Sequence, residues 1–235
     1  MKNKRFGLIR NVYKRLAFWL ACLAALAYSS WPLGYVLNPS VGRYQLASQL
    51  ESPHQPFNWL FITTDVLTGL FIVIVGALQL RSKHKRRLLN LCISGYIVFG
   101  LLVAITALVP INCDPTTTSC GPLLHDPKVV VHGLASILSV LCLFASTVII
   151  APTIYLTRRS KSTNIISFIV LSSWIIFGVG ALIEIYLKIT GNTLQYFFIT
   201  VCSLSIIFVI SSIEHIYLHE KRKLAYEPVE IDDNL

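Results

Sequence analysis

The sequence predicts an all-α fold, an integral membrane six-transmembrane-helix bundle, and three observations support this class. Of the 235 residues, 54% are hydrophobic and only 13% are charged, whereas about a quarter of an average soluble protein is charged. Six apolar stretches are long enough to cross a bilayer, because a helix that rises about 1.5 Å per residue needs about 20 residues. The basic residues are confined to the short stretches between them. The net charge of +9 therefore indicates membrane orientation and does not predict a nucleic-acid partner.

The apolar stretches lie at about 16–37, 57–80, 88–110, 129–156, 165–189 and 194–218. The first one follows basic residues and includes LAFWLACLAALA, which also fits a secretory signal whose cleavage would leave five spans. We interpret it as a retained span because the apolar run continues to Leu37. Pro32 is expected to bend the outer end of this helix, and Asn38-Pro39 to end it. Residues 1–15 and 219–235 are expected to flank the membrane domain.

The basic residues also predict the orientation of the bundle. Counted along alternate sides of six spans, 17 of the 20 Lys and Arg residues fall on the side that carries both termini. By the positive-inside rule this side is cytoplasmic, and loops 38–56, 111–128 and 190–193 face outward. We expect a plasma (inner) membrane location, with anionic lipids at the cytoplasmic face. Four aromatic residues near the outer ends are expected to form an interfacial belt: Trp31, Tyr35, Trp59 and Tyr186.

Two cysteines flank the segment CDPTTTSC in the outer loop. Cys113 and Cys120 would lie in an oxidising compartment if this loop faces outward, so they are predicted to form a disulfide. Their spacing is not typical of zinc ligands. The bridge would hold the loop over the outer mouth of the bundle.

Three ionisable residues lie within the spans and away from the cytoplasmic ends: Asp65, His132 and Glu184. Their depths place all three in the outer leaflet, where an ionisable side chain is costly and frequently functional. Other polar residues lie nearby, with Thr64 next to Asp65, Ser136 one helical turn after His132, and Asp114 and His125 in the loop above. The sequence therefore predicts one outward-facing polar pocket with the ligand-binding residues Asp65, His132, Glu184, Thr64, Asp114 and Ser136.

Each of these residues also has a structural interpretation. Glu184 can pair with Lys188 at a helix end, and His132 can be a hydrogen-bonded packing residue. Asp126 precedes Pro127 and is expected to be the N-cap of the fourth span. Asp65 has no basic residue near it in its own span, so it must be protonated or held from another helix. We predict that His132 holds it, directly or through one water.

The sequence leaves three function classes open. The favoured class is a module that binds or transports a cation, a small polar solute or a lipid head group. The second is a metal-dependent hydrolase at the outer leaflet, in which Asp65, His132 and His125 or Glu184 would hold zinc and activate water. The third is a scaffold whose polar residues only fix helix register. Phosphate-cradling glycine loops, G-x-S-x-G, H-E-x-x-H and C-x-x-C motifs are absent from the sequence.

Three segments resemble the membrane-protein family catalogued as domain of unknown function 998. They are TTDVLTG at 63–69, PINCDPTTTSCGP at 110–122 and HDPKVVVHGLASILS at 125–139. The resemblance implies a six-span protein over most of 16–218 and draws attention to Asp65, Asp114 and His132. The activity of that family is undefined, so the resemblance implies no chemistry.

Overall fold

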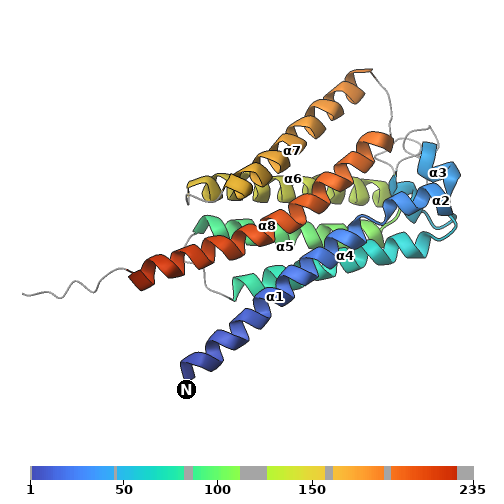
Figure 1. Ribbon diagram of the computed structural model, residues 1–235. Coiled ribbons are helices and arrows are strands. Elements are labelled where there is room, and N and C mark those ends of the chain that lie inside the picture. Colours follow the sequence, from blue (N-terminus) through green and yellow to red (C-terminus); the bar gives the residue numbers. More distant parts are fainter. Residues whose placement is uncertain are drawn as a thin grey trace, which may run out of the picture.

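Six long helices make up most of the protein, as the sequence predicts (Figure 1). The computed structural model describes residues 2–44, 47–81, 87–111, 126–156, 161–187 and 192–226. The long helices are α1 (Lys2–Tyr28), α4 (Asn58–Leu80), α5 (Arg87–Leu108), α6 (Pro127–Leu156), α7 (Lys161–Leu187) and α8 (Asn192–Tyr226). The described residues contain no strand, and they include six segments that are long and apolar enough to cross a membrane. The all-α class and the six spans are therefore confirmed.

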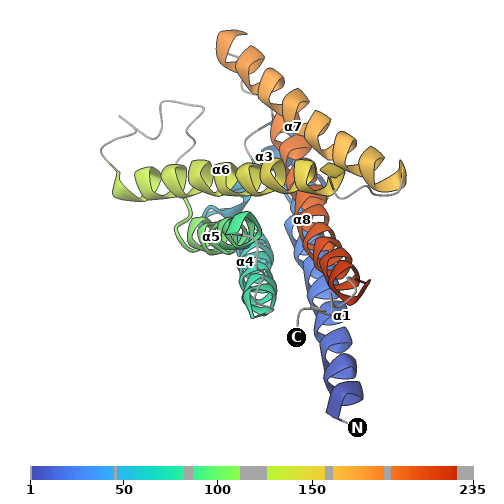
Figure 2. The ribbon, with the colours of Figure 1, turned by 90° about the vertical axis from the view of Figure 1, so that its left-hand side faces the viewer.

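The long helices differ in how deeply they are buried. α4, α5 and α6 pack against one another in chain order, and α1 lies against α4 and α8. The span within α8 is 61% buried, because α8 contacts α1, α6 and α7. The span within α7 is only 17% buried, and Figure 2 shows this helix at the edge of the bundle, inclined to α6. Its exposed apolar side chains, such as Ile175 and Ile176, suit contact with lipid.

The start of α1 and the end of α8 lie at the same end of the bundle, as six crossings require (Figure 1). α1 begins at Lys2, and α8 continues to Tyr226, beyond its apolar segment Leu194–Ile213 (Figure 1). Within the described residues, the flanks predicted at 1–15 and 219–235 are thus helical extensions of the first and last spans.

The first span is broken near its end. α1 stops at Tyr28, and the chain continues as η1 (Trp31–Leu33) and α2 (Gly34–Leu37). Pro32 lies within η1, which confirms the predicted bend. Asn38 ends α2 as expected, but Pro39 then starts another short helix, α3 (Pro39–Tyr44), since proline is well tolerated in a first helical turn.

The stretch expected to be an outer loop, 38–56, is partly helical and packs into the bundle. After α3 it contains η2 (Ala47–Glu51), where Ala47 and Leu50 are fully buried. The backbone N–H of Ala47 donates to the side-chain oxygen of Gln195 on α8. Leu50 lies directly against Gly34 of α2. η2 is therefore held against two other elements, and Glu51 at its end is turned into the protein.

Candidate functional site

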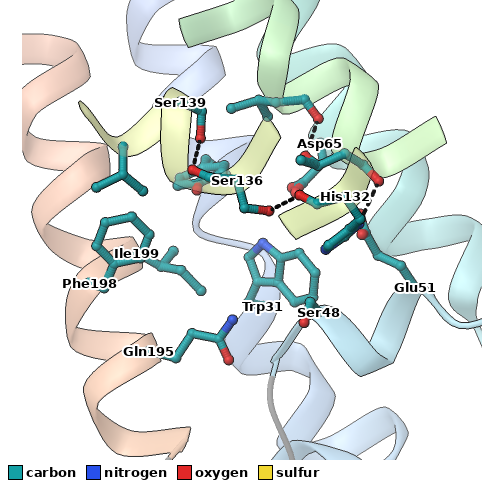
Figure 3. A pocket seen from close by; sticks show the side chains of 14 residues that line it. Trp31, Ser48, Glu51, Asp65, His132, Ser136, Ser139, Gln195, Phe198 and Ile199 are labelled. Carbon is teal, nitrogen blue, oxygen red and sulfur yellow. Dashed lines mark hydrogen bonds between the residues drawn. The ribbon is translucent and has the colours of Figure 1, made fainter. Parts of the chain in front are cut away.

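A cavity of about 100 Å³ lies where η1 and η2 meet the long helices (Figure 3). Its described lining comes from α1, α4, α5, α6 and α8 as well as η1 and η2, and none of it comes from α7. About 30 Å³ of liquid belongs to each water molecule, so the cavity has room for a few waters or one small solute. The polar lining residues are Ser48, Glu51, Asp65, Thr106, His132, Ser136, Ser139 and Gln195, and the others are Tyr28, Trp31, Val103, Val140, Phe198 and Ile199.

Asp65 is positioned by α4 and by the broken end of the first span. Its side chain is only 5% exposed and hydrogen-bonds to the Trp31 side chain. The indole of Trp31 stacks on Phe61, one turn before Asp65 on α4, with ring centroids 5.6 Å apart and planes at 26°. The second carboxyl oxygen, Oδ1, has no hydrogen-bond partner among the residues that the structure describes. Asp65 is therefore oriented on one side and unsatisfied on the other.

Trp31 does not belong to an interfacial belt, which corrects the prediction for this residue. It is 4% exposed, whereas Tyr35, Trp59 and Tyr186 are exposed. The break after Tyr28 turns η1 inward, so the indole lines the cavity. An interfacial tryptophan and a tryptophan at an inward bend look alike in sequence, because both follow an apolar run.

Glu51 is the functional candidate that sequence reasoning missed. It lies in η2 and is only 2% exposed, and within the described part of the chain its Oε1 has no hydrogen-bond partner. Burial raises the pKa of Glu51 to about 8, since an apolar environment disfavours the charged carboxylate. Glu51 also interacts electrostatically with Asp65 across the cavity (Figure 3). The only local signal is the three-residue spacing of Ala47 and Leu50, which places an apolar face beside this glutamate.

His132 is 7% exposed and connects α6 to the end of α5. Its Nδ1 lies 3.1 Å from the carbonyl oxygen of Thr106 and 3.0 Å from that of Val109. Both partners are acceptors, so we assign the hydrogen to Nδ1, which leaves Nε2 as an acceptor in the neutral ring. Carbonyls in the last turn of a helix lack intrahelical partners, and His132 supplies one. Through Nδ1, His132 thus acts as a hydrogen-bonded packing residue, which is the structural interpretation given for it above.

The predicted direct bond between His132 and Asp65 is not made in this structure. The Nδ1 atom of His132 is engaged by α5, and Oδ1 of Asp65 is without a partner. The two residues nevertheless line the same cavity. A bridging water between them stays a prediction.

The other predicted site residues are divided between the cavity, its surroundings and undescribed parts of the chain. Ser136 lines the cavity and donates to the backbone oxygen of His132 at 2.8 Å. Thr64 is not part of the lining, because its hydroxyl bonds to Ser30 on the broken end of the first span, at 2.8 Å. Glu184 lies on α7, and its side chain is outside the described part. Asp114 and His125 fall within 112–125, also outside the described residues.

The predicted metal site and the predicted disulfide both involve side chains outside the described part of the chain. Among the described residues, no group of three or more His, Cys, Asp or Glu side chains could hold a metal ion. The zinc site proposed for Asp65 and His132 would therefore need His125 or Glu184 as a further ligand.

The described cysteines are all free, and Cys113 and Cys120 lie outside the described residues. Their disulfide stays a prediction.

The prediction for Asp126 is confirmed. Its carboxylate accepts a hydrogen bond of 2.8 Å from the backbone N–H of Lys128, at the second position of α6, and Pro127 occupies the first. This carboxylate serves as an N-cap outside the cavity.

The acidic side chains of the described lining are not balanced by Lys or Arg side chains. Two buried carboxyl groups face the cavity, and none of the described lining residues is Lys or Arg. Hydroxyl groups of Ser48 and Ser136 add further oxygen atoms. Such a site can keep protons on its carboxyl groups or accept a positive charge from solution.

Comparison with known proteins agrees with the architecture. The family model described as "Protein of unknown function (DUF998)" matches residues 21–211, which is most of the chain and includes all six spans in whole or in large part. Neither the curated proteins nor the solved structures gave a match. The chain therefore belongs to the DUF998 family of multi-pass membrane proteins.

Proposed function

We propose that this protein binds a small cation, or the cationic group of a polar solute or lipid head group, in the cavity between Asp65 and Glu51. One observation carries this proposal: both carboxyl groups are buried, each has an oxygen without a hydrogen-bond partner among the described residues, and the described lining contains no Lys or Arg. A buried carboxylate is stable only when it is paired or coordinated. A cation between the two carboxyl groups would satisfy both.

We further propose that the cavity opens to the outer side of the membrane. The distribution of 17 basic residues on the side of the termini supports cytoplasmic termini. η2 then lies at the outer end, as does the loop that carries Cys113 and Cys120. A disulfide between them would shorten that loop near the entrance, and the basic cytoplasmic segments would contact anionic lipids.

The test is a cation screen of purified protein in lipid nanodiscs at fixed pH and ionic strength. Sodium, potassium, calcium and methylammonium each replace a bulky organic cation, and the melting temperature is recorded. We expect at least one of them to raise it in a saturable manner, since a ligand at a hundred times its Kd adds about 2.7 kcal/mol to stability. Asp65→Asn should abolish this rise.

Asp126→Asn is the matched control, because it makes the same chemical change at a carboxylate outside the cavity and asparagine is also a good N-cap. It should keep the full cation response. If no cation raises the melting temperature, or if Asp65→Asn responds like the unmodified protein, the cavity is not a cation site. The polar residues would then serve only to fix the packing of the helices.

A further inference from the structure

The charge balance of the cavity restricts how a cation can enter it. Glu51 and Asp65 are 2% and 5% exposed, and they interact electrostatically. Two carboxyl groups that share a site of low polarity do not both ionise, because each negative charge disfavours the other and burial disfavours both. Without a cation, at least one proton must therefore remain on the pair.

Other groups around the pair do not remove this requirement. The titratable residues of the described lining are Tyr28 on α1 and His132 on α6, besides the two carboxyl groups. The Nδ1 hydrogen of His132 is shared by the backbone carbonyl groups of Thr106 and Val109, so this residue could become positively charged only by taking a second proton on Nε2. Tyr28 is a neutral phenol. A proton is thus the only positive charge that the described lining can supply.

The chemistry of the unsatisfied atoms indicates which cation fits. Asp65, Glu51 and His132 all line the cavity; among the described residues, Oδ1 of Asp65 and Oε1 of Glu51 have no hydrogen-bond partner, and Nε2 of His132 is an acceptor in the tautomer assigned above. Three acceptors match the three N–H donors of a primary ammonium group. The aromatic side chains of Tyr28 and Trp31 line the same cavity, and aromatic rings favour ammonium groups over strongly hydrated metal ions.

We propose that the cavity exchanges a proton for a primary ammonium group. The ligand R–NH3+ enters, one proton leaves the Glu51–Asp65 pair for solution, and the net charge of the cavity stays constant. No covalent bond other than the O–H bond is broken. This inference rests on the proposed cation-binding function and adds the ligand class and the coupled proton. The ammonium group can come from a free amine or from an ethanolamine lipid head group, since both present the same three donors.

The experiment measures proton release and binding together. Protein in phosphatidylcholine nanodiscs, at pH 7 in weak buffer with a pH indicator, is titrated with methylammonium chloride while calorimetry records binding. We expect about one proton to be released per methylammonium bound. While the pair is protonated, below about pH 8, the affinity should therefore increase about tenfold for each unit by which the pH is raised. Glu51→Gln should lose both the release and most of this pH dependence, whereas Asp126→Asn should keep them.

The possible results of this titration test the proton exchange, the ligand class and the cation site separately. Binding of methylammonium without proton release would overturn the exchange while leaving the cation site intact. Equal release by sodium or by tetramethylammonium, which has no N–H donor, would overturn the assignment to a primary ammonium. Absence of any cation binding would overturn the proposed function itself. The same titration in phosphatidylethanolamine nanodiscs identifies the source: a head-group ligand would already fill the cavity and suppress the release seen in phosphatidylcholine.

Discussion

Glu51 and Asp65 each have a buried oxygen that no donor of the described residues satisfies. Such a group costs about 1–3 kcal/mol when it is neutral and more when it is charged. Because the described lining of the cavity contains no Lys or Arg, this cost depends on the protonation of the two carboxyl groups. The pH of the solution should therefore act on stability through these two residues.

The first prediction follows from the raised pKa of Glu51, about 8 when folded against about 4.5 when exposed. Between these values the folded protein holds more protons than the unfolded chain, so stability should decrease as pH rises from about 4.5 to about 8. The decrease should be at most about 1.4 kcal/mol per pH unit for this one proton. Melting temperatures measured in a buffer of bulky organic cations check it.

Glu51→Gln should flatten this profile, because the amide does not titrate, and Glu51→Asp should keep it. The other titratable residues of the described lining are Asp65, His132 and Tyr28, and all three remain in both variants. An unchanged slope in Glu51→Gln would mean that this carboxyl group does not carry the proton.

Sequence reasoning found Asp65 because an acidic residue inside an apolar run is conspicuous. It missed Glu51 because an acidic residue in a polar stretch resembles any solvated loop residue. Its burial arises from contacts distant in sequence, such as the bond between Ala47 and Gln195. The contact of Thr64 was hidden for a related reason: the broken first span brings Ser30 within reach of its hydroxyl. A hydropathy pattern reveals a polar residue inside an apolar span, but it does not show which residues contact it in the folded protein.

At the scale of the helices, α4 and α5 approach closely where glycines meet. A Cβ atom at Gly69 would overlap the carbonyl oxygen of Gly100 and lie 2.9 Å from the Cβ of Ala104. Small residues at such contacts allow backbones in a membrane to pack closely. This contact lies one turn after Asp65, so it helps to fix the position of the carboxyl group relative to α5.

The second prediction compares the same substitution at two glycines. Gly69→Ala should lower the melting temperature, because overpacking typically costs about 1–3 kcal/mol. Gly133→Ala on α6 should leave it unchanged or raise it slightly, since, its own helix backbone aside, no atom of the described residues lies within 4 Å of the added Cβ, and alanine favours a helix. Equal effects of the two substitutions on purified protein would contradict the close contact between α4 and α5.

The six spans could be predicted because each is a continuous apolar run of sufficient length. The short helices between α1 and α4 could not, because α2 and α3 have only 4 and 6 residues and carry no sustained periodicity. They form because they pack against the end of the bundle. The adjoining short elements η1 and η2 contribute Trp31, Ser48 and Glu51 to the cavity, so the segment whose structure is least evident from the sequence helps to build the site.

For the whole molecule, the third prediction concerns orientation. His54 and Arg81 are exposed and lie just before and just after α4, at opposite ends of one span. In a background without native cysteines, His54→Cys should react with a membrane-impermeant maleimide on intact cells. Arg81→Cys should react only after permeabilisation. Reaction of Arg81→Cys on intact cells, with His54→Cys protected, would invert the proposed orientation of the cavity.

The most direct test of a cation held between Asp65 and Glu51 is the infrared difference spectrum on adding methylammonium. A protonated carboxyl group absorbs apart from a carboxylate, so each form is visible. We predict that binding removes a protonated-carboxyl band and strengthens carboxylate bands, and that the double variant Asp65→Asn/Glu51→Gln shows neither change. A spectrum in which the carboxyl bands stay constant, or change equally in the double variant, would contradict a cation site at these residues.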